Sequence, residues 1–495
     1  MKQLLQLAMA LVLPFGAMAQ SVTVTMTTPG TLPEQIGADQ KMEVKSLKVI
    51  GDINGTDIAY IREMGIGTRN AMWKYESNLM ILDLSEANIV EGGDPFINSY
   101  PYPQTVANEV SGSMFEKFVA LVELKLPNSV TRISRNGINN CGLLAELQLP
   151  SSLNTIEHYG VYYCGSISEL LIPASTKVIE ETAFYGSGIQ KVTIEASEID
   201  LQPGAFAGLE NLTSIEASAD NKSFSSIDGV LYSKDGSTLM LYPGGRDAAE
   251  YTVASGVTAI ANYGFYGNGH VTEVVLPSTV ESIGDYAFDG CGSLAAINFP
   301  EALKSIGKWA FAAGPKLTTV DLGNSKVTEV GDNAFFGNSV LAELTLSETL
   351  ERVGEYAFSN GVYKELSLPA TLRYIGKNGF HNTNLENVYA HGMEPAECDG
   401  DVFAQEEIAS VLFQTPTAVL HVPEGTLDAY KEAMGFKYFY TIVDDIIATG
   451  IEGVVTDGCV ATEYYDLSGR RVRNPENGIY VVRYSNGTTG KVVVR

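Results

Sequence analysis

One short pattern of residues returns through most of this chain and limits the folds that the chain can adopt. The pattern reads L-x-x-L-x-L-P, then V/L-x-x-I, then G-x-x-A-F, as in Val271–Phe288, where valine takes the first and fourth positions. Its fourth position is apolar in twelve units, spaced by 22 to 24 residues apart from one step of 36. A repeat of this length is typical of a solenoid, in which each unit stacks on the next. We therefore predict a β-rich leucine-rich-repeat solenoid of about a dozen units.

The physics of one unit explains why the units must stack. The two apolar residues of L-x-L share one face of a strand, and the proline then ends that strand because it has no N–H to donate. The V-x-x-I segment and the A-F dipeptide are expected to turn the chain back and fill the interior. We expect a structural ladder of aromatic residues, one from each unit: Phe184, Phe206, Phe265, Phe288, Phe311, Phe335, Phe358, Phe380 and Phe403.

The single long step contains an insertion near residues 222–250. Val230–Ser233 and Thr238–Tyr242 read as two short strands, with Asp235 and Gly236 at the turn between them. Asp-Gly between two apolar runs is a strong hairpin signal. We predict a hairpin that projects from the edge of the solenoid.

The two ends of the chain differ from the repeats. Residues 1–19 carry a basic start, a short apolar run and a small-x-small site before Gln20, which predicts a secretory signal peptide. Residues 20–120 are predicted to form an N-terminal cap, with a helix over Ile58–Met64 that Thr56 or Asp57 caps and Gly65 ends.

The solenoid itself is expected to occupy residues 121–445, including a C-terminal cap. That cap should contain a last strand at Val419–Pro423, a helix over Thr426–Met434 and the apolar segment Phe436–Val443. Residues 446–495 have a different composition and three short apolar runs, which predict a small separate β module.

The charge of the chain excludes several partners. Acidic residues outnumber basic residues 59 to 32, for a net charge of −27. Such a surface repels nucleic acid and anionic membranes, and no stretch beyond the signal segment is apolar enough to cross a bilayer. Cationic or neutral macromolecules and metal ions stay open as partners, and the acidity also serves simple solubility.

The cysteines allow two interpretations. There are five, and Cys141 and Cys164 lie 23 residues apart at the same turn position of successive units. Stacked units would place them about 4.8 Å apart, which permits either a disulfide or two buried free thiols. Cys398 and Cys459 have no obvious partner.

Catalytic and cofactor motifs are absent from the sequence. The five histidines form no helical i, i+4 pair, and there is no C-x-x-C pair, no G-x-S-x-G elbow and no phosphate-binding glycine loop. We predict neither an enzyme nor a cofactor. Two acidic segments, residues 52–57 and 394–407, are candidate calcium loops. The glycine of the first segment is not at the position that a calcium loop requires, and the second segment favours a solvated loop.

The outward face of the L-x-L strands is the candidate binding site, and we expect it to be concave. Glutamate occupies the third position in seven of the twelve units. Like charges one strand apart repel, so stability gives no reason to repeat them. We hypothesise that this face binds a basic or polar macromolecule, while solubility alone is the alternative explanation. The candidate residues are Glu123, Lys125, Glu146, Gln148, Glu169, Lys191, Thr193, Glu273, Asn298, Thr319, Asp321, Glu343, Thr345, Glu365 and Ser367.

The repeat resembles the BspA-like class of bacterial leucine-rich repeats, most clearly at Leu147–Cys164 and Val274–Cys291. The segment Gly51–Met64 is similar to the N-terminal region often joined to these repeats. The resemblance covers about residues 120–423 and implies secreted or cell-surface proteins of host-associated bacteria, some of them implicated in adhesion to host matrix or to other bacteria. It implies no particular ligand.

The C-terminal residues carry a second resemblance. Tyr465–Val472, Gly478–Val482 and Lys491–Val494 resemble the sorting domain of the type IX secretion system, although the segment is short for such a domain. This resemblance implies a Bacteroidetes source, export across the outer membrane, and attachment to the surface or release. Taken together, the sequence favours a surface adhesion or binding protein, with a structural component of the bacterial surface as the alternative.

Overall fold

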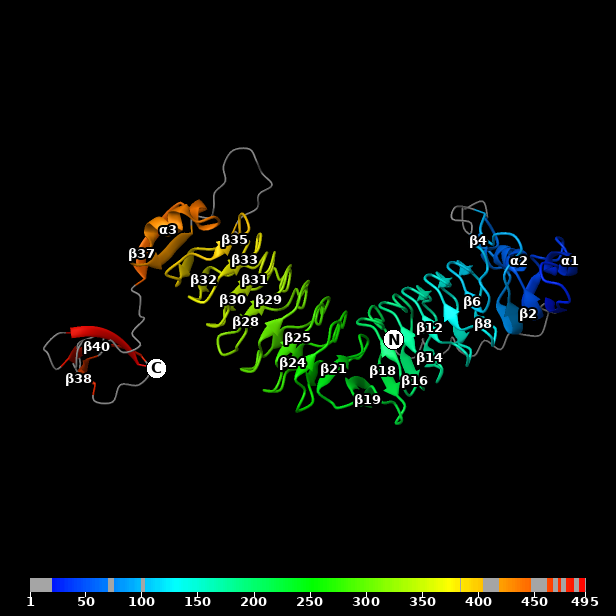
Figure 1. Cartoon of the computed structure of the whole chain (residues 1–495), viewed down its shortest axis with the longest axis horizontal. Helices are drawn as coiled ribbons and strands as arrows, with labels where there is room; N and C mark the ends of the chain where they lie inside the picture. The colour runs from blue at the N-terminus through cyan, green and yellow to red at the C-terminus, as the bar shows by residue number, and fades with distance from the viewer. Residues whose placement is uncertain are drawn as a thin grey trace, which may run out of the picture.

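The chain folds into a long array of stacked coils. The computed structural model describes residues 20–69, 75–98, 103–382, 384–403, 418–446, 461–465, 471–472, 478–484 and 489–494. Figure 1 shows the coils following one another along a bent solenoid, with helices near both of its ends. The prediction of a leucine-rich-repeat solenoid is therefore confirmed. The predicted signal peptide lies outside the described residues, and within them no helix is long and apolar enough to cross a membrane.

The L-x-L segments form parallel strands that run along one side of the array and make up the main sheet. Leu124 pairs with Leu147 in the next coil, and both point into the core while their neighbours point outward. The main-sheet strands of the repeats are β8 (Glu123–Lys125), β11 (Glu146–Gln148), β14 (Glu169–Ile172), β16 (Lys191–Ile194), β18 (Ser214–Ala217), β22 (Glu250–Thr252), β24 (Glu273–Val275), β26 (Ala296–Ile297), β28 (Thr319–Asp321), β30 (Glu343–Thr345), β32 (Glu365–Leu368) and β34 (Asn387–Ala390).

The V-x-x-I segments form a second parallel ladder, which the sequence interpretation had treated only as a return turn. Its first part comprises β6 (Glu109–Val110), β9 (Arg132–Ile133), β12 (Thr155–Ile156), β15 (Val178–Ile179) and β17 (Asp200–Leu201). Its second part continues through β23 (Ala259–Ile260), β25 (Ser282–Ile283), β27 (Ser305–Ile306), β29 (Glu329–Val330), β31 (Arg352–Val353), β33 (Tyr374–Ile375) and β35 (Glu397–Cys398). A short third ladder joins β7 (Phe115–Glu116), β10 (Ile138–Asn139) and β13 (Val161–Tyr162).

Between the ladders, the repeated phenylalanines form stacks of parallel rings. Phe311 is 2% exposed, and its ring centroid lies 4.9 Å from those of both Phe288 and Phe335. The stack continues to Phe265 on one side and Phe358 on the other. Phe380 and Phe403 extend this stack, while Phe184 and Phe206 form a separate pair. Each ring thus covers its neighbour, and a missing ring leaves a cavity that no single coil can close.

The insertion does not project from the solenoid, and that prediction is wrong. It forms an antiparallel meander of β19 (Phe224–Ile227), β20 (Val230–Ser233) and β21 (Thr238–Leu241), whose last strand pairs with β23 of the second ladder. Val230, Leu231 and Tyr232 are all buried, so β20 has apolar residues on both of its faces. A strand of this kind is stable only between two apolar layers, which is why it lies inside the array.

The meander divides the interior into two hydrophobic cores. Leu231 packs in the first core, which extends from the N-terminal cap, whereas Val230 and Tyr232 pack in the second. Successive residues of a strand point to opposite faces, so β20 acts as a wall between the cores. The bend of the array in Figure 1 lies beside β19 and β21.

The N-terminal cap extends the main sheet and covers the first coil. It contains β1 (Gln20–Thr25), α1 (Leu32–Ile36), β2 (Val44–Ile53), α2 (Gly55–Ile66), the short pair β3 (Thr68–Arg69) and β4 (Tyr75–Glu76), and β5 (Ile81–Ile89). Helix α2 is longer than predicted, because Asn54 caps it in a capping box with Asp57 and Gly67 ends it. Gly65 instead lies inside the helix, where a Cβ atom would meet the ring of Phe118 at 2.3 Å.

At the other end, β36 (Val419–Pro423) and β37 (Thr441–Ile446) add two strands to the main sheet. Helix α3 (Leu427–Glu432) and the 3-10 turn η1 (Phe436–Tyr438) lie between them. The helix is shorter than predicted, ending before Met434. In its described residues, the C-terminal module has four antiparallel strands and not the predicted three: β38 (Ala461–Tyr465), β39 (Arg471–Val472), β40 (Gly478–Tyr484) and β41 (Thr489–Val494), in the order β39-β38-β40-β41. The additional strand arises because Arg471 and Val472 pair back onto β38.

The structure has no disulfide between Cys141 and Cys164, which are both free and buried. Interaction with Cys141, together with burial, raises the pKa of the Cys164 thiol well above its ordinary value. Burial also raises the pKa of the Cys291 thiol to about 12. Because the thiolate is the reactive form, the thiols of Cys164 and Cys291 have little nucleophilic character at neutral pH.

We therefore expect Cys291 to resist alkylation until the protein unfolds. With a pKa of about 12, roughly one thiol in ten thousand is ionised at pH 8. Maleimide labelling at pH 8, mapped by mass spectrometry with and without urea, measures this protection. Rapid labelling of Cys291 in the folded protein, or a Cys141–Cys164 disulfide in the non-reduced digest, would contradict this arrangement of thiols.

Candidate binding surface

The structure places the candidate residues on one continuous outward face of the main sheet. Their neighbours in each strand point inward, so the alternation that predicted this face is present in the coordinates. Glu123, Lys125 and Thr193 are half-buried. The exposed members are Glu146, Gln148, Glu169, Lys191, Glu273, Asn298, Thr319, Asp321, Glu343, Thr345, Glu365 and Ser367.

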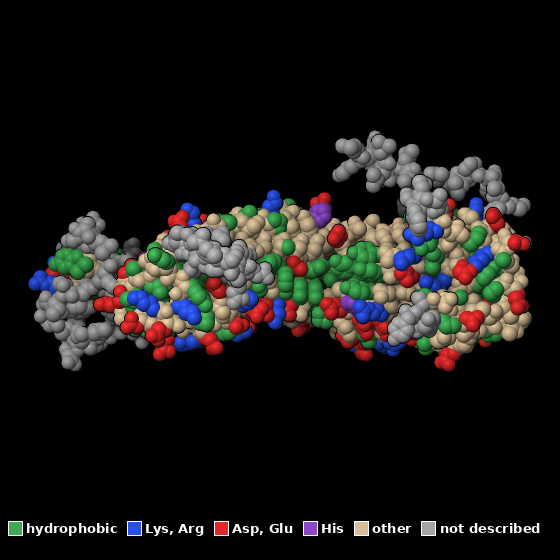
Figure 2. Space-filling view, turned by 90° about the horizontal axis from the view of Figure 1, so that it is seen from above, with side chains coloured by type: hydrophobic (Ala, Val, Ile, Leu, Met, Phe, Trp, Pro, Cys, Tyr) green, Lys and Arg blue, Asp and Glu red, His purple; other side chains and the backbone are tan. Residues whose placement is uncertain are grey.

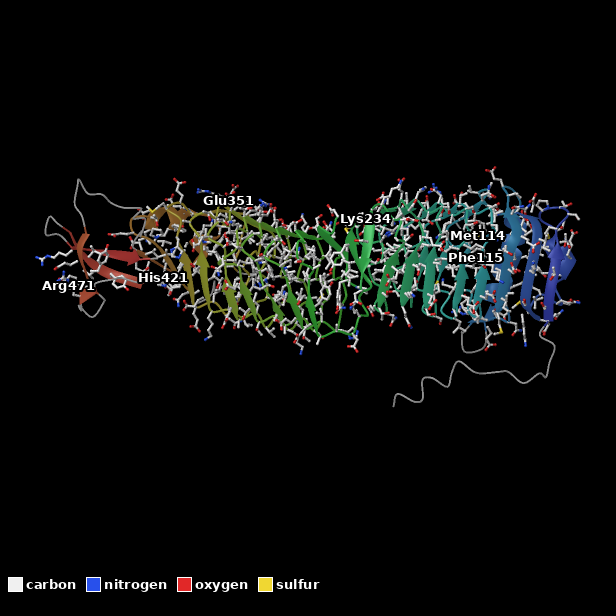
Figure 3. All side chains as sticks on the ribbon, turned by 90° about the horizontal axis from the view of Figure 1, so that it is seen from below. Met114, Phe115, Lys234, Glu351, His421 and Arg471 are labelled. Carbon is white, nitrogen blue, oxygen red and sulfur yellow. The ribbon has the colours of Figure 1, made fainter. Side chains whose placement is uncertain are left out.

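The face lies on the outer side of the bend and not on a concave side. In Figure 1, β14, β16, β18, β24 and β28 follow the lower, outer edge of the array, while β12, β25 and β29 lie nearer its inner edge. Figure 3 views the array from that lower side, with its strands crossing the long axis. The expectation of a concave face does not match this arrangement, and the bend lies beside the meander that interrupts the coils.

Carboxylates of neighbouring coils stand directly opposite each other on this face. Glu123 pairs in register with Glu146, and Glu250 pairs with Glu273. Side chains in such positions are about 4.5–5.5 Å apart at Cβ, and like charges there are unfavourable. The solenoid therefore keeps repulsive pairs that its own folding does not require.

Some of these charges are balanced within the face. Lys125 Nζ lies 2.9 Å from Glu123 Oε1 and 3.8 Å from Asp83 Oδ2. A hydrogen bond from the Lys125 ammonium to Glu123 raises the pKa of Lys125, since it favours the charged form. Further along, the Thr319 hydroxyl donates to Glu343 at 3.3 Å. Exposed contacts of this kind contribute little to stability.

A groove opens in the face where the main sheet is interrupted between β11 and β14. The five-stranded sheet ends at β11, and the next sheet begins at β14. The groove has a volume of about 470 Å³, and the side chains that line it include three charged residues, Glu146, Glu169 and Lys191, together with Gln148 and Leu171. The main sheet is also interrupted between β18 and β22, between β26 and β28, and between β30 and β32, so the groove marks one of four interruptions among the described strands.

The groove combines unneutralised acceptors with an exposed apolar residue. Among the described residues, the carboxylates of Glu146 and Glu169 form no hydrogen bond and no ion pair, although Glu169 stands opposite Lys191 in the next strand. Leu171 is 51% exposed between them and Lys191. A pair of carboxylates can accept hydrogen bonds from a lysine or arginine side chain. An aliphatic side chain beside them can pack against the methylene groups of that lysine or arginine.

A polar cluster at the C-terminal end of the face was missed by the sequence interpretation. The Tyr389 ring stacks on His421 with centroids 4.6 Å apart, and His421 Nδ1 lies 2.9 Å from Asp445 Oδ1. These residues come from β34, β36 and β37. The alternation in Val419–Pro423 placed His421 outward, but Asp445 became its neighbour only through the pairing of β37 with β36.

The acidic segments weighed as calcium loops have other structural roles where they are described. Asn54 and Asp57 accept hydrogen bonds from backbone N–H groups around the start of α2. Part of residues 394–407 lies outside the described residues. Within those that the structure describes, no cluster of three or more histidine, cysteine or acidic side chains could hold a metal ion.

The fold and this face define a bacterial-type leucine-rich-repeat solenoid with an exposed, acidic sheet. The family described as "BspA type Leucine rich repeat region" matches residues 108–228 and 258–413 in six copies. The chain belongs to this family. The unmatched gap, residues 229–257, contains most of the meander that interrupts the repeats.

Several solved structures are similar to this chain. The pneumococcal vaccine antigen PcpA is 20% identical, covering 68% of this chain and 85% of its own, with a TM-score of 0.43. A leucine-rich repeat protein from Eubacterium ventriosum is 21% identical, covering 51% and 80%, with a TM-score of 0.41. One from Bacteroides ovatus is 18% identical, covering 70% and 90%, with a TM-score of 0.36. No curated protein matches the chain.

Proposed function

We propose that this protein is a secreted or cell-surface binding protein that recognises a macromolecule with the outward face of its main sheet. The observation that carries the proposal is the pair of carboxylates, Glu146 and Glu169, which have no hydrogen-bond or ion-pair partner among the described residues and lie beside the exposed Leu171 in the groove between β11 and β14. The ligand class that fits is a protein or glycoprotein surface of host or bacterial origin that presents lysine or arginine.

The route to the surface is part of the same proposal. Residues 1–19 act as the signal peptide, residues 20–120 as the N-terminal cap and residues 121–445 as the binding solenoid. Residues 446–495 act as a sorting module of the type IX secretion system, which implies a Bacteroidetes source and display on the outer-membrane exterior. The resemblances of both terminal segments support this route.

We expect the double substitution Glu146→Lys and Glu169→Lys to weaken binding at least tenfold. Reversing both charges replaces attraction by repulsion, which changes affinity by several kcal/mol at close contacts. The assay is saturation binding of the purified protein to immobilised matrix proteins, mucin and glycans at two salt concentrations. Binding through this face should also weaken as salt increases.

The matched control is Glu348→Lys with Glu351→Lys. Both glutamates are exposed, both lie outside the groove, and the change in net charge is the same. Equal loss in the two variants would count against the face and point to net charge alone. Failure of the folded protein to bind any member of the panel, together with self-association in sedimentation, would favour the structural alternative.

A further inference from the structure

The inner side of the array has a break in its second ladder. The five-stranded part of this ladder ends at β17, and no described strand pairs with the far edge of β17. One coil earlier, the Ile179 carbonyl accepts a hydrogen bond from Gln202 N–H at 3.0 Å. No backbone hydrogen bond to the equivalent carbonyl of Leu201 is found among the described residues, because in the next coil the Ala261 N–H donates to the Leu239 carbonyl of the meander at 2.9 Å. An edge strand of this kind can pair with an additional strand.

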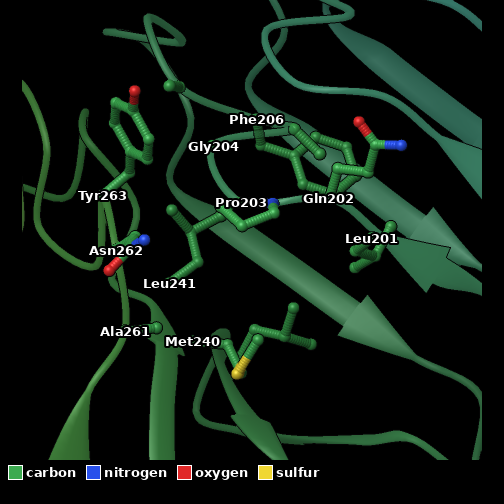
Figure 4. A pocket seen from close by; sticks show the side chains of 13 residues that line it. Leu201, Gln202, Pro203, Gly204, Phe206, Met240, Leu241, Ala261, Asn262 and Tyr263 are labelled. Carbon is green, nitrogen blue, oxygen red and sulfur yellow. The ribbon is translucent and has the colours of Figure 1, made fainter. Parts of the chain in front are cut away.

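An apolar pocket lies beside this edge. Its volume is about 120 Å³, and its walls come from three parts of the chain: Leu201 and Phe206 before the meander, Met240 and Leu241 within it, and Ala261 after it. Figure 4 shows these side chains surrounding the opening. Apolar cavities of about 150 Å³ can hold a benzene molecule, so the pocket suits one aliphatic side chain.

Hydrophobic side chains gather around the pocket on the surface. Figure 2, which views the array from above, shows them concentrated near its middle. The Tyr263 ring, which lines the pocket, stacks on Tyr286 with centroids 5.0 Å apart, and Tyr286 stacks on Trp309 at 6.2 Å. Tyr263, Tyr286 and Trp309 are each partly exposed and form an aromatic stripe that is continuous with the pocket.

The backbone of this aromatic stripe is in an unfavourable conformation. Tyr263, Tyr286 and Trp309 have φ values of 61°, 56° and 57°. This left-handed region suits asparagine, and Asn136 and Asn333 occupy the equivalent position of other coils. Tyr159, Thr182 and Tyr356 share this positive φ at the equivalent position of other coils, so the conformation belongs to the repeat, and what is particular to this row is its three stacked aromatic side chains.

Carboxylates border the same rim. The Tyr263 hydroxyl donates to Glu181 Oε1 at 2.9 Å, across the break between the two cores. Burial raises the pKa of the Tyr266 hydroxyl to about 12, and the nearby carboxylates of Asp289 and Glu210 add to this shift; the Tyr266 ring lies 5.5 Å from that of Tyr263. Aromatic rings and carboxylates together favour cationic groups.

We propose that this break, which we name the seam, docks an extended segment of a partner protein with an aliphatic residue flanked by lysine or arginine. The segment adds a strand to β17, its aliphatic side chain enters the pocket, and its cationic side chains lie over the rim. Pairing through the backbone provides affinity and the pocket provides selectivity, as in other modes of strand addition. The seam lies on the inner side of the array, so this interaction goes beyond the function proposed for the main sheet.

The test measures fluorescence polarisation of labelled seven-residue peptides with the full chain. One peptide has the sequence Lys-Val-Lys-Leu-Lys-Val-Lys, and the second replaces its lysines with glutamates. Saturable binding of the first peptide, at least tenfold tighter than that of the second, is expected. Absence of saturable binding, or equal binding of both peptides, overturns the proposal.

Two variants locate the site. Ala261→Leu fills the pocket and should weaken binding at least tenfold, whereas Ala342→Leu, at an exposed alanine beside β30, should not. If circular dichroism shows that Ala261→Leu impairs folding, the double variant Glu181→Gln with Glu210→Gln replaces it in the test. This double variant should also weaken peptide binding at least tenfold. Unchanged binding in the folded variants overturns the proposal. If the protein alone forms a dimer and Ala261→Leu dissociates that dimer, the seam binds a second copy of the chain. This result also overturns the proposal.

The same assay separates this site from the main-sheet face. The variant with Glu146→Lys and Glu169→Lys should bind the lysine peptide as the unchanged protein does. Loss of peptide binding in that variant would move the peptide to the main-sheet groove and so overturn the seam proposal.

Discussion

Replacing Phe311 with alanine is expected to unfold the second core at lower urea concentration while the first core stays folded. Phe311 is 2% exposed and lies between two stacked rings, so its removal leaves a cavity that the neighbouring coils cannot fill. Truncations of this kind cost about 3–5 kcal/mol. In a repeat array the loss acts mainly on neighbouring coils, because each coil contacts only its neighbours.

The measurement is hydrogen exchange by mass spectrometry across a urea series, followed separately in residues 121–217 and 251–403. Phe184→Ala is the matched variant in the first core, where the buried Phe184 stacks on Phe206 at 5.5 Å. We expect each substitution to shift the transition of its own core only. Equal shifts of both regions in either variant would show that the meander couples the cores into one cooperative unit.

The stacked coils could be predicted because every unit repeats the same pattern of apolar residues. A residue such as Leu147 or Phe311 appears in the same register as its counterparts, so errors in one unit are corrected by the others. The inward and outward sides of the main sheet followed directly from that register. Physical constraints that act on all units alike are therefore visible in the sequence alone.

The meander was misplaced because it occurs once and has no counterparts. An Asp-Gly turn between two apolar runs predicted a hairpin, but a projecting hairpin would need one polar face. Val230, Leu231 and Tyr232 are apolar in succession, which is the signature of a strand buried on both sides. That feature was available in the sequence and should have favoured an internal position.

The groove and the seam could not be predicted by any reading of single units. Both arise where neighbouring coils fail to pair, between β11 and β14 and beyond β17. Their positions depend on small shifts accumulated over the stack, not on the identity of one residue. The left-handed position of Tyr263 is an exception, since asparagine at the equivalent Asn136 and Asn333 gives a sequence signal for that backbone conformation.

The second large effect is expected from Asp57→Ala in the N-terminal cap. The side chain of Asp57 is fully buried and accepts hydrogen bonds from three backbone N–H groups, those of Gly30, Leu32 and Asn54, at 2.6, 3.0 and 3.0 Å. It thereby fixes the loop before α1 to the start of α2. Alanine would leave three donors without their acceptor, and each buried unsatisfied donor costs about 1–3 kcal/mol.

We expect a total loss of roughly 3–5 kcal/mol that is concentrated in residues 20–69. The exposed Asp52 provides the control, since its carboxylate accepts one side-chain hydrogen bond among the described residues, from Asn88 at 3.1 Å, and Asp52→Ala should change stability by less than about 0.5 kcal/mol. Limited proteolysis and hydrogen exchange measure where protection is lost.

The consequence reaches beyond the cap, because an uncovered terminal coil exposes the first core to solvent. Asp57→Ala should therefore also promote aggregation through the open edge of the main sheet, which light scattering detects at the urea concentration where the cap opens. If protection fell in the first core and not in residues 20–69, the capping role assigned to Asp57 would be wrong. If the cap of this variant opens at a lower urea concentration than the coils, one buried carboxylate controls the stability of the N-terminal end of the array.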